Sequence, residues 1–264
     1  IFPFHSWVPM VSEGSHPTVI SFLLLIMPTA IVVFGLKFFN RYPFLRELEN
    51  LDLTLRVFGT VMIVVGGLWT AFQDNLKRAF GFSSLTESGF TLLALSLIPQ
   101  GGISWLLMLI PARVLAFWLW GYVLARIEGY TGSQNIQDLH GFARRYPLLS
   151  ITLLLAQLSI AGLPLLAAFP VKLNLLTALR GAGLPFFTWS FIGNLGLILF
   201  TLRLLTSLVQ PEDQTIPQKY AIHEKTHEIL AVAAAILLLV LFGLFPGTFL
   251  AWITDILTAF PQLQ

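Results

Sequence analysis

Lys172 has the clearest capacity for chemistry in this sequence, because it places a cation inside an otherwise apolar stretch. Gly162 and Pro164 interrupt that stretch shortly before the lysine, and Pro170 interrupts it again. Such residues free backbone carbonyls and amides inside a membrane helix, and these groups then need water or polar partners. Desolvation disfavours the charged form of a lysine, so a lysine beside a hydrated break can hold and pass a proton. The alternative is a lysine whose stem lies in lipid and whose ammonium reaches the headgroups.

Lys77 is the second candidate, because it lies at the junction of two apolar stretches with no long loop between them. Asp74 precedes Lys77 by three positions and Arg78 by four, so one helical turn would bring these charges together. We therefore expect Lys77 in a proton path, with Asp74 as a supporting charge. A basic cap at the end of a membrane helix is an equally good interpretation.

Glu87 is a carboxylate within the next apolar stretch, ten residues after Lys77. Ten residues of helix span about 15 Å, so these two side chains cannot touch and need water or other residues between them. Arg113 lies in the following stretch, stays charged and needs a partner, for which Glu87 is one possibility. We predict Glu87 in the proton path and Arg113 as a supporting charge. The alternatives are a neutral carboxyl bonded to a hydroxyl, and a purely structural ion pair.

Several other kinds of site are excluded or disfavoured. The sequence has no cysteine, which excludes disulfides, iron–sulfur clusters and thiolate metal sites. His223 and His227 have the spacing of a metal-binding pair, but a solvated loop is the better interpretation, and no metal is expected. No glycine-rich phosphate-binding loop is present, so no cofactor is expected. A net charge of +2 gives no reason to expect nucleic acid as a partner.

The elements that must position these residues are helices in a lipid bilayer. The sequence is 56% hydrophobic and 11% charged, whereas a soluble domain has about 25% charged residues. A span needs about 20 apolar residues, and the chain contains about seven such stretches, one of them discontinuous. We therefore predict an all-α, polytopic membrane helix bundle. The expected spans are Val19–Phe39, Val57–Gln73, Ala79–Ile98, Ile103–Ile127 (interrupted by Pro111 and Arg113), Leu148–Leu179 with its break, Leu184–Val209, and His227–Thr248, which Phe249–Phe260 either continues or follows along the interface.

The polar stretches between these spans are too short to hold a soluble catalytic domain. The chain begins at Ile1 rather than at methionine, and its start lacks the pattern of a signal peptide. We expect a part of a longer chain.

A family resemblance is carried by three groups of segments that occur in one order across nearly the whole chain. They are Pro3–Pro9 with Glu13–Thr18, then Asn75–Arg78 with Phe82–Phe90, and finally Ser159–Pro164 with Phe169–Lys172. In that order they resemble the P-x-H-x-W-x-P and EG-x-PT, D-x-KR-x-x-AYSS, and LSLAG-x-P…GF-x-x-K segments of the antiporter-like, proton-translocating membrane subunits of respiratory complex I. The segment Asn135–Phe142 is most similar to the subunit N type, which adjoins the quinone arm. Multisubunit cation/proton antiporter subunits are related.

The resemblance implies a fourteen-helix fold made of two inverted five-helix repeats, each with a broken helix, of which this chain holds the C-terminal part. Residues 1–98 would end the first repeat, and residues 99–264 would hold the second repeat and the C-terminal helices, all in one membrane domain. It also implies a line of buried charges. Lys77 matches the lysine of the family's K-R pair, Lys172 matches the broken-helix lysine of the second repeat, and Glu87 stands where the family often has His or Gln.

Two positions depart from the family pattern. The family has a lysine just after a proline on its first broken helix, and here Thr29 follows Pro28. The family's aspartate two residues before the K-R lysine is Asn75 here. A weakened pump or a divergent relative therefore stays an open alternative.

Our hypothesis is a membrane subunit of a proton-pumping NADH–quinone oxidoreductase-type complex, with the redox chemistry in other subunits. Its expected partners are those membrane subunits, the lipid bilayer, and quinone through neighbouring subunits. Its expected location is a bacterial plasma membrane or an energy-transducing organelle membrane. The alternatives are a subunit of a multisubunit cation/proton antiporter and a non-pumping subunit retained for packing.

Overall fold

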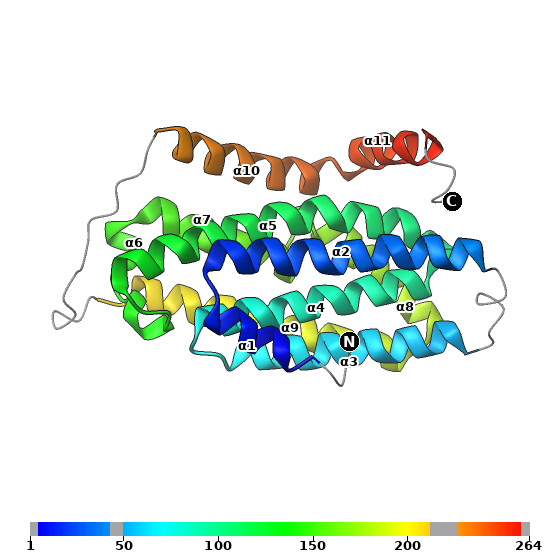
Figure 1. Cartoon of the computed structure of the whole chain (residues 1–264), viewed down its shortest axis with the longest axis horizontal. Coiled ribbons are helices and arrows are strands. Elements are labelled where there is room, and N and C mark those ends of the chain that lie inside the picture. Colours follow the sequence, from blue (N-terminus) through cyan, green and yellow to red (C-terminus); the bar gives the residue numbers. More distant parts are fainter. Residues whose placement is uncertain (1–4, 43–49, 212–225, 260–264) are drawn as a thin grey trace.

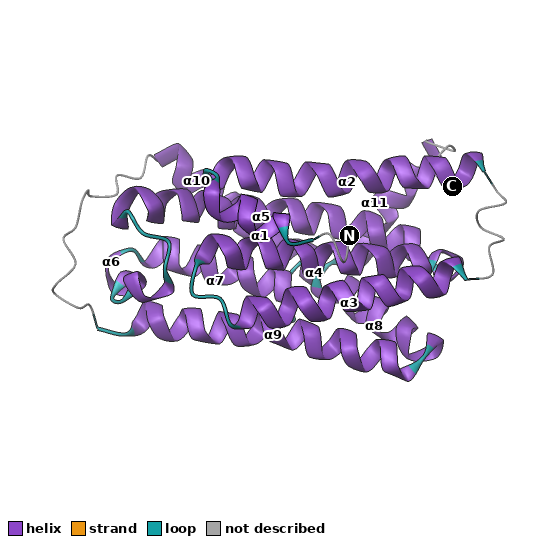
Figure 2. Ribbon diagram, turned by 60° about the horizontal axis from the view of Figure 1, so that its bottom comes forward, coloured by secondary structure: helices purple, strands orange, loops and turns teal. Residues whose placement is uncertain are grey.

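The structure is a computed structural model that describes residues 5–42, 50–211 and 226–259. Within these residues it consists of helices, together with one isolated bridge between Asn75 and Asn135 (Figures 1 and 2), which confirms the predicted helical bundle. In chain order the helices are α1 (Trp7–Gly14), α2 (Pro17–Arg41), α3 (Leu51–Ala71), α4 (Leu76–Ser96), the short 3-10 helix η2 (Ile98–Gln100), α5 (Gly102–Thr131), the short 3-10 helix η3 (Ile136–Leu139), α6 (Phe142–Arg145), α7 (Pro147–Ala161), α8 (Phe169–Ala182), α9 (Leu184–Val209), α10 (Thr226–Leu244) and α11 (Pro246–Ala259).

The break predicted around Gly162 and Pro164 separates α7 from α8. Gly162 caps α7 with a left-handed backbone, φ 72°, which favours glycine because it has no Cβ. Helix resumes at Phe169, and Pro170 occupies the first turn of α8, where its missing N–H costs no hydrogen bond. The predicted discontinuous helix is confirmed.

Two other prolines do not break their helices. α5 continues as one helix through Pro111 and Arg113, the two residues that interrupt its apolar sequence. α2 likewise continues through Pro28, where the resemblance implied a broken helix. Neighbouring helices and hydroxyl side chains re-satisfy the groups that a proline frees in a membrane helix, so proline alone does not predict a break.

Among the described residues, four helices are long and apolar enough to cross a membrane: α2, α3, α5 and α9. A fifth span results if α10 and α11, which are bent by 94° at Phe245, are counted together. The predicted count of about seven also included α4 and the α7–α8 pair. α4 is long enough to cross a membrane, but it is less apolar than the four spans and carries Lys77, Arg78 and Glu87. α7 and α8 are each too short to cross alone.

Small residues let the backbones of α3, α4 and α9 approach closely. A Cβ placed on Gly67 of α3 would lie only 1.8 Å from Gly193 O of α9, and one on Gly89 of α4 would lie 2.7 Å from Gly59 O of α3. Helices in lipid associate through such close packing, because apolar burial from water gives them little driving force. This three-helix unit fixes the position of α4.

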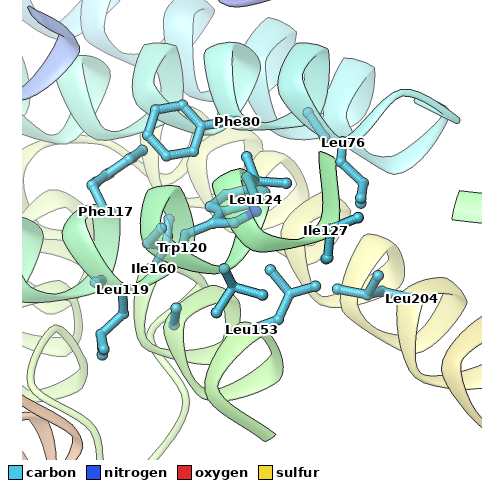
Figure 3. Packing of buried hydrophobic residues seen from close by; sticks show 14 of the residues in the cluster. Leu76, Phe80, Phe117, Leu119, Trp120, Leu124, Ile127, Leu153, Ile160 and Leu204 are labelled. Carbon is cyan, nitrogen blue, oxygen red and sulfur yellow. The ribbon is translucent and has the colours of Figure 1, made fainter. Parts of the chain in front are cut away.

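The main apolar core joins α4, α5, α7 and α9. Figure 3 shows Trp120 of α5 near the middle of this core, with Phe80 of α4 on one side and Ile160 and Leu153 of α7 on the other. The rings of Phe80 and Trp120 meet edge to face with centroids 5.1 Å apart. α10 and α11 lie along the outside of the bundle against α5, and α10 also contacts α7 (Figure 1). α8, which carries Lys172, packs against α4 and α5 in a second apolar cluster through Val171, Leu175 and Leu179.

Candidate proton-transfer site

Lys172 lies inside the bundle and not at its lipid-facing surface. α8 begins after the break, and its first turn aims the lysine at the end of α7, where the ammonium donates a hydrogen bond to Ile160 O. A second donor reaches Asn194 Oδ1 of α9 at 3.4 Å. The side chain is only 3% exposed. This geometry contradicts the alternative of a lysine reaching for the headgroups.

The break itself creates these contacts. α7 ends in a capping turn in which Gly162 N–H and Leu163 N–H donate to Ser159 O and Leu158 O, and this leaves Ile160 O and Ala161 O to other donors. Lys172 satisfies Ile160 O, and Asn194 Nδ2 donates to Ala161 O at 2.7 Å. A Cβ on Gly162 would lie 2.9 Å from Lys172 Cδ, so the glycine also leaves room for the lysine stem. The broken helix is thus a binding site for one ammonium group.

Glu87 is the counter-ion of Lys172. Its Oε1 lies 2.7 Å from Lys172 Nζ, and both side chains are 3% exposed. The Lys172 ammonium also lies 4.2 Å from the centroid of the Phe90 ring, one turn further along α4, which adds a cation–π contact. The sequence placed Lys172 and Glu87 in one path but did not predict that they touch.

Arg113 is the second cation at Glu87, as the sequence suggested. Its Nε lies 3.3 Å from Glu87 Oε2, and its guanidinium also donates to Glu87 O and to Thr91 Oγ1, both at 2.7 Å. Arginine keeps its charge at every accessible pH. One carboxylate therefore faces one cation that can lose a proton and one that cannot.

Lys77 lies in a separate polar cluster at the end of the bundle where α4 begins. Asn75 caps α4 by accepting hydrogen bonds from the backbone N–H groups of Lys77 and Arg78. The Lys77 ammonium donates to Ser15 O, at the end of α1, over 2.9 Å and to Glu128 Oε1 of α5 over 2.8 Å. Sequence reasoning missed Glu128, because it stands 51 positions away among other polar residues at a helix end.

Asp74 does not join this cluster, and its predicted contact with Lys77 and Arg78 is wrong. Asp74 precedes the N-cap of α4 and therefore lies outside the helical turn that the prediction assumed. It pairs instead with Arg203 of α9 at 2.6 Å, in an exposed position. Arg78 pairs with Glu13 of α1 at 2.6 Å.

The structure therefore brings Lys172, Glu87 and Arg113 together and leaves Lys77 apart. Lys77 and Glu87 are separated by ten residues of α4, or about 15 Å. Asn194 was also missed by the sequence, since one asparagine among apolar residues gives no sign of its partner. The side chains of His223 and His227 lie outside the described residues, and elsewhere in the described chain no three potential metal ligands come together.

The sequence and the fold have counterparts in known proteins. The family described as "NADH:quinone oxidoreductase/Mrp antiporter, TM" matches residues 1–199. The chain belongs to this family. As a member of the NADH:quinone oxidoreductase/Mrp antiporter family with helices long enough to cross a bilayer, it is an integral membrane protein.

Individual members of the family cover almost all of the chain. NADH-quinone oxidoreductase subunit N of Psychrobacter arcticus is 28% identical over 260 residues, which are 95% of this chain and 52% of that protein. A chain in a structure of respiratory complex I from Thermus thermophilus with bound Aureothin has a TM-score of 0.75 and 27% identity, over 95% of this chain and 54% of that one. A chain of the Mrp complex from Dietzia shares the fold, with a TM-score of 0.76 and 16% identity over 95% and 54% of the two chains. The chain spans about half the length of the relatives that it matches.

Proposed function

We propose that the chain forms part of a proton-translocating membrane subunit of an NADH–quinone oxidoreductase-type complex, and that Lys77, Glu87 and Lys172 carry part of its proton path. The buried contact between Lys172 and Glu87 is the observation that supports this most directly. Ionisable groups inside a membrane bundle are costly, and they commonly mark paths for ions or protons. Arg113 would be a fixed cation that supports this pair.

The rest of the assembly is part of the same proposal. Residues 1–98 would end a first repeat and residues 99–264 would form the second repeat and C-terminal helices of a longer, inverted-repeat fold with about seven spans in this part. Neighbouring membrane subunits would be its partners in the bilayer. Redox chemistry and quinone binding would belong to other subunits. The charges of the buried groups in this chain would couple to that chemistry electrostatically.

A proton entering the site would change the charge balance around Glu87. When Lys172 is charged, its ammonium and the Arg113 guanidinium both stabilise the carboxylate. When Lys172 gives up its proton, Arg113 alone remains, and the field at Glu87 changes by one charge. Each transfer therefore alters the next group in the line. Movement between Glu87 and Lys77 would need ordered water, for which the buried hydroxyls of α4 offer partners.

Substitution of Lys172 tests this function. In inverted membrane vesicles that contain the complete complex, we expect Lys172→Met to abolish NADH-driven proton uptake, because methionine cannot exchange a proton. Lys172→Arg retains the charge but does not release it, so we expect it to be defective as well. Lys37→Met, on the exposed surface of α2, is the control. Normal pumping by Lys172→Met, scaled to the amount of assembled complex, would contradict the proposal.

The family description names two kinds of complex, so cation/proton exchange is the second candidate. Sodium-dependent proton exchange in vesicles without an electron donor would favour it. A non-pumping, structural subunit is the third candidate, because Thr29 stands in place of the family lysine. Unchanged ion transport after substitution of Lys77, Glu87 and Lys172 together would establish that role.

A further inference from the structure

We propose that Glu128 is the group through which Lys77 exchanges protons with the aqueous phase at this end of the bundle. The inference rests on the proposed proton path and adds its outer step. Lys77 is nearly enclosed, with 4% of its side chain exposed, whereas the Glu128 side chain that contacts it is 32% exposed. The carboxylate therefore lies between a buried amine and the surface.

The position of Glu128 in α5 explains this placement. It precedes the end of α5 by one turn, and Gly132 N–H closes the helix on Glu128 O. The bridge between Asn75 and Asn135 brings the following loop against the start of α4, and Leu76 N–H donates to Gln134 O at 2.8 Å. Gln134 Nε2 in turn donates to Glu128 Oε1 at 2.8 Å. The loop thus holds the carboxylate against Lys77.

The two carboxylate oxygens of Glu128 have different surroundings. Oε1 accepts hydrogen bonds from Lys77 and from Gln134. Oε2 is buried and has no hydrogen-bond partner among the described residues. A protonated carboxyl donates one hydrogen bond and still accepts others. Oε2 is therefore the oxygen that can hold a proton while Oε1 keeps both of its contacts.

The transfer is a simple acid–base exchange. A proton leaves Lys77 Nζ for the Glu128 carboxylate, which converts an ammonium and a carboxylate into a neutral amine and a neutral carboxylic acid. Because Oε2 is buried while the side chain as a whole is 32% exposed, the acid releases this proton only when water reaches Oε2 or the carboxyl turns toward its exposed side. Glu128 is then a carboxylate again, and Lys77 takes up another proton from the interior. The same steps in reverse would admit a proton.

The ion pair between Arg78 and Glu13 lies at the same end of α4, but it does not link a buried amine to the surface. Arg78 and Glu13 are 47% and 40% exposed, and both can be hydrated directly. Arg78 also keeps its proton at all accessible pH values. Glu13 is therefore a matched control: an acid paired with a cation near the same helix start, but without a buried amine to serve.

Glu128→Gln in the complete complex tests the inference. The amide oxygen can still accept from Lys77 and Gln134, but the amide cannot carry a proton, so we expect proton pumping to fall about a hundredfold or more, as for a lost acid–base group. Glu128→Asp should recover much of the pumping, because it restores an ionisable group. Glu13→Gln should pump at the wild-type rate.

The outcomes separate this inference from the proposed function. Loss of pumping in Glu128→Gln with normal amounts of assembled complex, and recovery in Glu128→Asp, supports it. Normal pumping by Glu128→Gln overturns it, as does a loss that merely follows a loss of assembled complex. If Lys172→Met abolishes pumping while Glu128→Gln does not, only the role of Glu128 fails. If Lys172→Met pumps normally, the proton path itself fails.

Discussion

Lys172 Nζ lies 2.7 Å from Glu87 Oε1 inside the bundle, although the two residues belong to α8 and α4. The lysine is held there by the free end of a broken helix, and the glutamate is held by an arginine from α5. Neither charge has bulk water to stabilise it, so each depends on the others.

Glu87→Gln should destabilise the assembled subunit, because it leaves two buried cations without an anion. Breaking a buried ion pair by removing one partner costs about 3–5 kcal/mol. We expect less assembled complex and no proton pumping. Removing both charges in Glu87→Gln/Lys172→Met should restore much of the stability but none of the pumping. Thermal unfolding of the purified complex and vesicle pumping measure the two effects, and a double variant less stable than Glu87→Gln would contradict this account.

Gly162→Ala should distort the lysine site. The left-handed backbone at this position costs a non-glycine residue about 1–2 kcal/mol, and the new Cβ would press on the Lys172 stem, 2.9 Å away. We expect lower thermal stability together with reduced pumping. Gly181→Ala, in α8 with nothing within 4 Å of the added Cβ, is the control and should be neutral. Equal stability of the two variants would show that the cap tolerates a side chain.

Asn194→Leu should weaken the attachment of α9 to the broken helix. The substitution removes the donor to Ala161 O and one acceptor of Lys172. Leaving a buried carbonyl unpaired costs about 1–3 kcal/mol, and the lysine loses a contact that fixes its direction. We expect reduced pumping as well as reduced stability. Thr188→Ala, which removes an exposed hydroxyl from the same helix, should change neither.

Asp74 and Arg203 should differ in importance although they form one ion pair. Both side chains are exposed, and exposed pairs contribute about 0–1 kcal/mol, so Asp74→Asn should leave stability and pumping close to the wild type. Arg203 also donates to the backbone oxygens of Ala71 and Gln73, which ties α9 to the turn before α4. Arg203→Gln should therefore destabilise the complex more than Asp74→Asn. A large pumping defect in Asp74→Asn would restore its expected role as a supporting charge.

The sequence predicted the helical class and the broken helix well, because both depend on local composition. Gly162 and Pro170 mark the break by their own backbone chemistry, whatever surrounds them. Pro28 and Pro111 lie inside unbroken helices, because the effect of a proline inside a membrane helix depends on the helices around it. A proline accompanied a helix break only between α7 and α8, where Gly162 caps α7 and Pro164 and Pro170 follow.

Most of the side-chain pairing could not be predicted. The contact of Glu87 with Lys172 and that of Lys77 with Glu128 join distant parts of the chain, and spacing along one helix says nothing about them. The pairing of Glu87 with Arg113 was suggested only because a buried arginine must have a partner. Asp74 was misplaced because α4 begins at Leu76, two positions after it, so Asp74 does not share a helical turn with Lys77 and Arg78.

Two cations share one carboxylate around Glu87, so this part of the bundle keeps a surplus of positive charge. A sodium ion arriving there would have to shed its water and approach Lys172 and Arg113 with a single anion to offset both. A proton needs no cavity of ligands, because it is carried as an N–H bond of the Lys172 amine. If the chain carries protons as proposed, this surplus of positive charge would disfavour metal cations at the cluster, and sodium-dependent exchange through this site would contradict that expectation.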